Sequence, residues 1–289
     1  MRVLFLLTLL ALAPRIWARP PGPPPPAAPQ DIPADEVDRS KLLPQDLAWL
    51  DDPRFHWKHL QTEHFILHHD QKIFAAKVAR MGEQFHAAIS ADLPNLQDRV
   101  SPFRSHIFIF RDPRDWKTVV AGSPGLDPWV ASYVRGNAMF LQETGVAASD
   151  KMGTLAHEMT HLVFNRFLPV RLPLWLNEGL AEYYGEFAYR SAKGMGQSKS
   201  NAFRPLRAWI PMGDLLDATD YPADPADAAR FYATSKYLVG FLLLRQPRDR
   251  WDAFFARILA GHPARAALLE TYGWPDAAAL EKAFAAFAR

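Results

Sequence analysis

The sequence lacks cysteine altogether among its 289 residues. Disulfides, thiolate-bound zinc, iron–sulfur clusters, a cysteine nucleophile and a lipid-modified cysteine are therefore excluded for this chain. It also lacks a charge excess, because the formal net charge is only +2 and the basic residues are scattered rather than clustered. A nearly neutral, unclustered surface does not favour nucleic acid as a partner. We found no internal repeat, which argues against a solenoid or propeller.

Long apolar runs are scarce, and the main one is residues 3–13, directly after Arg2. It is shorter than the ~20 residues that span a bilayer and has the length of a signal-peptide core. The small residue Ala18 suits cleavage, so we expect 1–18 to be a signal peptide and the protein to be exported, periplasmic or secreted. An uncleaved anchor is the alternative. After cleavage we expect no stable membrane span, and residues 19–40 read as a proline-rich disordered linker.

The chemistry is concentrated in the pattern His157-Glu158-x-x-His161, which lies in a stretch with helical spacing of apolar residues. Residues four apart share one face of a helix, about 6 Å apart along its axis, so both imidazoles can reach one metal ion. Glu158 points beside the metal, where a general base for the attacking water belongs. The alternative is a buried helix whose histidines hydrogen-bond to neighbours. Ser149-Asp150 offers an N-cap, and Pro169 lies beyond the far end.

A second helix is predicted at 175–184, with Pro173 at its first turn. Glu178 and Glu182 are four residues apart and share a face. A catalytic zinc takes three protein ligands and keeps one open position, so Glu178 is the candidate third ligand. Glu182 is then the candidate partner for the second N–H of a ligating histidine. Gly179 inside the helix costs about 1 kcal/mol relative to alanine, which a close approach to the first helix would explain.

Together, His157-Glu158-x-x-His161 and Asn177-Glu178-Gly179-x-Ala181 resemble the motifs of the gluzincin metallopeptidases, which include thermolysin and the membrane alanyl aminopeptidases. The likeness is strongest to the compact bacterial peptidase MA-like proteins and covers roughly residues 55–289. It implies Zn²⁺ held by His157, His161 and Glu178 in a thermolysin-like catalytic core. One difference is the connection between the two helices, which is shorter than in thermolysin.

The resemblance implies three further site residues. Gluzincins place a Tyr or His on a later helix to donate a hydrogen bond to the developing oxyanion, and Tyr232 is the candidate here, with Tyr237 less well placed. The alternative is that Tyr232 is a half-buried aromatic of an amphipathic helix. Asn137 and Ala138 begin a stretch similar to the edge strand that binds extended substrate in thermolysin-like enzymes. The acidic residue with which alanyl aminopeptidases bind a free amino terminus has no counterpart within 137–140.

We expect an α+β fold: a small, mostly antiparallel sheet packed on the zinc-binding helix, followed by an all-helical C-terminal lobe. Strands are predicted near 64–69, 105–110, 129–134 and 138–142, and they precede the helices rather than alternate with them. Residues 41–189 would form the α+β zinc-binding subdomain and 209–289 the helical subdomain. Residues 190–208 between them form a surface loop, with a lid over the cleft as the alternative. The histidines at 64, 68 and 69 alternate in direction along a strand and do not suggest a metal site.

The expected function is an exported zinc-dependent metallopeptidase that hydrolyses peptide or protein substrates, with Glu158 as general base. Two alternatives keep the gluzincin fold without turnover: a metal-binding scaffold and an envelope interaction protein. Glu158 argues against the scaffold, because metal binding alone does not need that carboxylate. A structural zinc site in an interaction protein would need a fourth ligand, which the two motifs do not provide. The sequence defines neither the side-chain preference nor endo- versus exopeptidase action, and it carries no signal for the oligomeric state.

Overall fold

The structure is a computed structural model that describes residues 27–93, 101–123, 126, 130–146, 152–168, 170–192 and 203–289. Several sequence predictions lie outside these ranges. They are the signal peptide at 1–18, the linker up to residue 26, the Ser149-Asp150 cap, Pro169 and most of the loop at 190–202. Within the described ranges, no helix is both long and apolar enough to cross a membrane.

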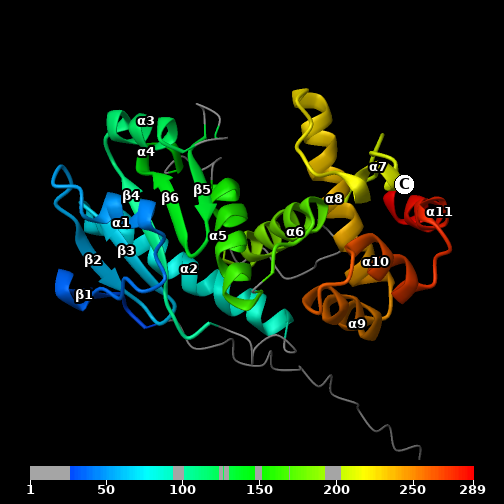
Figure 1. The fold of residues 1–289 in the computed structure, drawn as a ribbon, viewed down its shortest axis with the longest axis horizontal. Coiled ribbons are helices and arrows are strands. Elements are labelled where there is room, and N and C mark those ends of the chain that lie inside the picture. Colours follow the sequence, from blue (N-terminus) through cyan, green and yellow to red (C-terminus); the bar gives the residue numbers. More distant parts are fainter. Residues whose placement is uncertain are drawn as a thin grey trace, which may run out of the picture.

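The described strands form one six-stranded sheet in the order β1-β2-β3-β4-β6-β5 (Figure 1). Three neighbouring pairs are antiparallel and two, β3–β4 and β4–β6, are parallel. The α+β class with a mostly antiparallel sheet is therefore confirmed. The strands are β1 (Gln30–Ile32), β2 (Lys58–Gln61), β3 (Phe65–His69), β4 (Ser105–Phe110), β5 (Ser132–Arg135) and β6 (Ala138–Gln142).

The centre of the sheet differs from the sequence prediction. Because β3 and β4 are parallel, the chain must cross over between them, and α2 (Lys72–Asp92) makes this connection. The predicted separation of strands from helices is therefore wrong here. Every residue of β3 and β4 is buried, as expected for parallel strands that are covered on both faces. Strands without alternating burial are the signal that could have predicted the parallel pairing. Strands β1 and β2 were not predicted, and β1 lies in residues that the sequence analysis assigned to the linker.

Alternate residues of β4 supply two separate hydrophobic cores. Ile107 and Ile109 join a large core with α2 and the helices that follow the sheet. Phe108 and Phe110 face the other side, where they pack with Trp116 of α3 (Pro113–Ala121). This alternation follows from the two-residue period of a strand. The second face is also covered by residues near α1 (Pro44–Leu50), including Trp49.

The C-terminal lobe is helical, as predicted, and lies on the far side of α5 and α6 from the sheet (Figure 1). The helix α5 (Met152–Phe167) carries the His-Glu-x-x-His pattern, and α6 (Leu174–Ala192) carries the two glutamates. The remaining elements are the 3-10 turn η1 (Ala34–Glu36) and the helices α4 (Glu143–Val146), α7 (Met212–Asp217), α8 (Pro225–Arg245), α9 (Arg248–Leu259), α10 (Ala264–Tyr272) and α11 (Ala277–Ala288).

Two glycines allow α6 to lie close to a helix on each side. A Cβ atom at Gly179 would come within 2.5 Å of the Ser235 carbonyl oxygen on α8. The expected partner of Gly179 was α5, so that explanation is wrong. The glycine that faces α5 is Gly185, where a Cβ atom would lie 3.0 Å from the backbone of His157. α6 is thereby held between the histidine-bearing helix and the C-terminal lobe.

Candidate metal centre

Three potential metal ligands converge where α5 and α6 cross. His157 and His161 lie one turn apart on α5, and their Nε2 atoms are 3.1 Å apart. The Glu178 Oε2 atom of α6 lies 3.3 Å from His157 Nε2 and 3.5 Å from His161 Nε2. One ligand atom from each residue therefore faces a common point, and the trio could hold a metal ion.

The far end of α5 is anchored by a buried cation. Arg166 is only 4% exposed, and its guanidinium donates to the carbonyl oxygens of His64 at 3.1 Å and Ser101 at 2.9 Å. A third hydrogen bond reaches the carbonyl of Phe103. These bonds connect the turn that follows His161 to the segments that open β3 and β4. The histidine pair is thus positioned by the rigid sheet.

The second carboxylate oxygen of Glu178 is held by two donors. The Tyr221 hydroxyl donates to Glu178 Oε1 at 2.7 Å, and the Asn177 side-chain amide donates at 3.1 Å. Burial and the neighbouring carboxylate raise the pKa of Tyr221, so the hydroxyl stays protonated as a donor. Tyr221 lies on the connection between α7 and α8, 43 residues after Glu178, and no spacing pattern in the sequence pointed to it.

Glu182 lies on the opposite side of the His157 ring from the converging ligand atoms. Its Oε1 atom is 3.0 Å from His157 Nδ1. Burial disfavours a charged imidazole, but the contacts to Glu178 and Glu182 outweigh it and raise the pKa of His157 to about 10. Hydrogen bonds to His157 and His161 lower the pKa of Glu178, although its burial acts in the opposite direction. Two carboxylates around one histidine therefore create a centre that attracts a cation.

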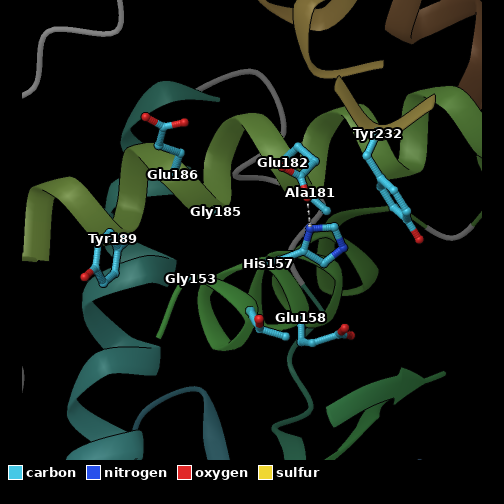
Figure 2. Close-up of a pocket in the computed structure, with 10 residues that line it drawn as sticks. Gly153, His157, Glu158, Ala181, Glu182, Gly185, Glu186, Tyr189 and Tyr232 are labelled. Atoms are coloured by element: carbon cyan, nitrogen blue, oxygen red, sulfur yellow. Dashed lines mark ion pairs between the residues drawn. The ribbon is translucent and has the colours of Figure 1, made fainter. Parts of the chain in front are cut away.

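A cleft of about 430 Å³ opens beside these ligands (Figure 2). We call it the acidic cleft, and its walls contain Glu158 next to His157 and Tyr232 from α8. The Tyr232 ring centroid lies 6.2 Å from that of His157. Burial raises the pKa of Glu158 against the opposing effect of the histidines. The other lining residues are Gly153, Thr154, Ala181, Glu182, Gly185, Glu186 and Tyr189.

The residues Asn137 and Ala138 are not on an edge strand. β6 lies between β4 and β5, and Ala138 is fully buried with partners on both sides, His106 and Arg135. Asn137 lies in the β5–β6 turn, where its side chain accepts from Ser105 at 2.7 Å and donates to Arg104 at 2.8 Å. The edge-strand prediction is therefore wrong, and with it the reason for assigning substrate binding to these two residues. The strand at this end of the described sheet is β5.

Tyr237 is separated from the centre by its own hydrogen bonds. Its side chain is 8% exposed, and its hydroxyl accepts from the backbone N–H of Arg204 at 2.8 Å and donates to the Arg204 carbonyl. This leaves Tyr232 as the α8 tyrosine that reaches the acidic cleft.

The histidines near β3 diverge. His68 faces neighbouring strands, with Nδ1 2.9 Å from His59 Nδ1 and Nε2 3.0 Å from His106 Nδ1, in a linear row. His64 instead contacts Glu83, and with Glu63 these form a second histidine–glutamate group. The His64 Nδ1 and Glu83 Oε2 atoms are 2.6 Å apart, which is a direct hydrogen bond and leaves no space for an ion between them.

Comparisons with known proteins add no family assignment. Neither a scan against protein-family models nor a search of curated proteins found a match to this chain. A function for this chain therefore has to be inferred from the geometry of the centre.

Proposed function

We propose that this protein is a zinc-dependent metallopeptidase of the gluzincin type. The observation that carries the proposal is the spacing of the three ligand atoms, at 3.1, 3.3 and 3.5 Å. A tetrahedral ion bound at about 2.0–2.1 Å holds its ligand atoms about 3.3–3.4 Å apart. Two imidazoles and one carboxylate are a donor set that suits zinc and leaves one position for water or substrate.

The surrounding residues support a bound cation. Glu182 orients the His157 ring so that Nε2 presents its lone pair to the ion, and Tyr221 with Asn177 keeps Oε2 of Glu178 turned toward the histidines. Zn²⁺, when bound, supplies Lewis-acid polarisation of the carbonyl and activation of the attacking water.

Hydrolysis then requires a proton acceptor and a hydrogen-bond donor from the chain. Glu158 lines the acidic cleft beside His157 and would take the proton of the attacking water, then deliver it to the leaving amine. Burial raises the pKa of Glu158, which is the direction that helps a carboxyl group both to take up and to return a proton. Tyr232 would donate to the oxygen on which negative charge develops. The carbonyl carbon gains the water oxygen, the C–N bond breaks, and the amine leaves protonated.

The polypeptide substrate would align along β5. This strand ends the described sheet and packs near α5, so its outer backbone groups are the ones to which an extended chain could add. This replaces the role expected of β6. Export of the protein remains part of the proposal, on the signal-like residues 3–13, and N-terminal sequencing of the mature protein checks it.

The test compares wild type with Glu158→Gln and, as a matched control, Glu270→Gln. Glu270 is an exposed surface residue that pairs with Arg257. We expect one equivalent of zinc in all three proteins by metal analysis. Turnover of casein and of a peptide library should fall about 10²–10⁴-fold in Glu158→Gln alone. A wild-type protein that holds zinc but cleaves nothing would instead favour the scaffold alternative.

A further inference from the structure

A second, larger cleft of about 750 Å³ adjoins the other side of the metal centre. It lies beside the connection between α5 and α6, and we call it the link cleft. Its walls come from the end of α5, the connection itself and the α7–α8 segment. Its lining includes Phe164, Leu168, Arg171, Leu216, Ala218, Thr219 and Tyr221.

The two clefts meet at the metal centre. Tyr221 lines the link cleft and Tyr232 lines the acidic cleft, and their rings stack with centroids 6.0 Å apart. Tyr221 also donates to Glu178 Oε1, while Glu178 Oε2 faces the histidines. Along α5, the acidic-cleft residues precede His161 and the link-cleft residues follow it. The reacting centre therefore lies between two hollows rather than at the end of one.

The inner wall of the link cleft is apolar, whereas Asp217, Thr219 and Asp220 line the cleft at exposed positions. Phe164, Leu168 and Leu216 supply buried side chains to it, with 4%, 7% and 6% exposure. Arg171 provides a cation in the wall and has no ion pair in the part of the chain that the structure describes. A cleft of this volume is large enough for at least one bulky side chain of a bound peptide.

Among the described residues that line the acidic cleft, the carboxylates are already engaged and offer little for binding a free amino terminus. Of its carboxylates, Glu182 contacts His157, and Glu186 is paired with Lys236. An exopeptidase that removes N-terminal residues needs a carboxylate available for the ammonium group, since burying an unpaired charge is costly. Glu158 is the proton acceptor in the proposed reaction and is not available for this purpose.

From these contacts we propose that the substrate is an internal segment of an extended polypeptide, bound across both clefts with a bulky apolar side chain in the link cleft. The protein is then an endopeptidase. This inference rests on the proposed peptidase function and specifies its substrate class. The competing outcome is a carboxyl-terminal exopeptidase, in which Arg171 binds the terminal carboxylate.

The first experiment uses the zinc-loaded protein and one peptide sequence, rich in Leu and Phe, in four forms. Its ends are free, N-acetylated, C-amidated or blocked at both ends. We expect the four kcat/KM values to agree within about fivefold, with internal cleavage next to a bulky apolar residue by mass spectrometry. A preference of more than about 100-fold for a free carboxyl end, abolished by Arg171→Met, would overturn the inference and leave the peptidase function standing. Cleavage of none of the four would overturn both.

The second experiment fills the link cleft. Ala218→Trp places a large ring in its wall, and Thr219→Trp does so from an exposed lining position should the first variant fold poorly. Ala223→Trp is the control, because Ala223 is exposed on the same segment and lines neither cleft. With zinc content unchanged, we expect at least a tenfold rise in KM for the doubly blocked peptide in the cleft variants only. Wild-type KM in both cleft variants would remove the link cleft from substrate binding.

Discussion

In the proposed mechanism, Tyr232 acts on the reacting carbonyl without binding the metal. Its ring faces His157 across the acidic cleft. Tyr232→Phe keeps the ring and its packing but removes one donor. We expect unchanged zinc content, little change in melting temperature and a fall in kcat of roughly 10²–10³-fold with KM nearly constant, the usual effect of losing an oxyanion donor. Steady-state kinetics with metal analysis measures this.

Tyr237→Phe is the matched control on the same helix. Its hydroxyl bonds to the backbone of Arg204, so its loss should lower the free energy of unfolding by about 1 kcal/mol while kcat is retained. A Tyr232→Phe protein that keeps kcat within about twofold of wild type, far from the expected loss, would remove Tyr232 from the mechanism.

Tyr221 is expected to act on the metal through Glu178. Without its hydroxyl, the Glu178 carboxylate keeps only the Asn177 amide at Oε1 and can rotate away from the histidines. We expect Tyr221→Phe to weaken zinc binding, with a dissociation constant about 10–100-fold higher, as is usual when a group that orients a ligand is lost. Competition with a chromogenic chelator measures this without any activity assay. An unchanged dissociation constant would mean that Asn177 alone orients the carboxylate.

At the scale of elements, the contacts of two glycines determine how closely α6 packs against its neighbouring helices. Alanine should favour an isolated helix by about 1 kcal/mol at either position. In this fold, Gly179→Ala meets the Ser235 carbonyl at 2.5 Å and Gly185→Ala meets the His157 backbone at 3.0 Å. We expect Gly179→Ala to lower the free energy of unfolding by about 1–3 kcal/mol, the cost typical of overpacking. Gly185→Ala should also weaken zinc binding, because it displaces the turn that carries His157.

The control for these two variants is Gly213→Ala. Gly213 lies in α7, and a Cβ atom there would meet nothing within 4 Å. We expect this variant to be neutral or slightly stabilised in chemical denaturation. Equal zinc affinity in Gly185→Ala and wild type would show that α5 can adjust without moving its histidine.

Most elements could be predicted because their signals are local. The apolar residues of α2 and α10 recur at helical spacing, and Asp112 caps α3 by accepting from the backbone N–H of Arg114, two residues on. The missed strands β1 and β2 are short, and β1 is only three residues long. Whether β6 lies inside the sheet or at its edge is decided by pairing with β4, which is distant in sequence and leaves no local pattern.

The candidate metal centre likewise combines residues that local spacing predicts with a residue that only the tertiary fold brings in. His157, Glu158, His161, Glu178 and Glu182 share two helices, where four-residue spacing predicts which side chains meet. Tyr221 meets Glu178 only because the α7–α8 segment folds back over α6. A contact between a loop residue and a helix leaves no regular spacing in the sequence, so no pattern could have predicted it. Gly179 was correctly recognised as a close approach, but a glycine does not indicate which neighbour approaches.

At the scale of the whole molecule, the sheet region contains several histidines that are buried without charge. Burial lowers the pKa of His68 well below its ordinary value, that of His106 to about 4 and that of His86 to about 3. In the unfolded chain these groups titrate near 6.5. Below that pH the unfolded chain binds protons that the folded protein does not. Its free energy of unfolding should therefore fall as the pH decreases from about 6.5 toward 4.

We expect His86 and His106 each to remove roughly 2 kcal/mol between pH 7 and pH 5, and His68 to act in the same direction. Urea denaturation of the metal-free protein at the two pH values measures the sum. His157, whose pKa is raised to about 10, stays protonated in the folded state, so the metal-free protein gains stability from it as the pH falls through 6.5, which offsets part of the loss. In His106→Gln, the fall in the free energy of unfolding between pH 7 and pH 5 should be smaller by the contribution of one histidine. Groups common to both proteins cancel in this comparison. The exposed residue His56 provides the control, and a His56→Gln protein should lose as much as wild type.

The position of α6 between α5 and α8 has a consequence for how the protein opens. Its amide protons are covered on one side by the histidine-bearing helix and on the other by the C-terminal lobe, with Gly179 and Gly185 bringing backbone against backbone. Hydrogen exchange from the middle of α6 therefore requires both neighbours to separate from it. We expect these amides to exchange among the slowest in the chain, in one cooperative unit with those around His157. A metal ion bound by Glu178 would slow that unit as a whole, so the exchange rate of α6 would report occupancy of the centre.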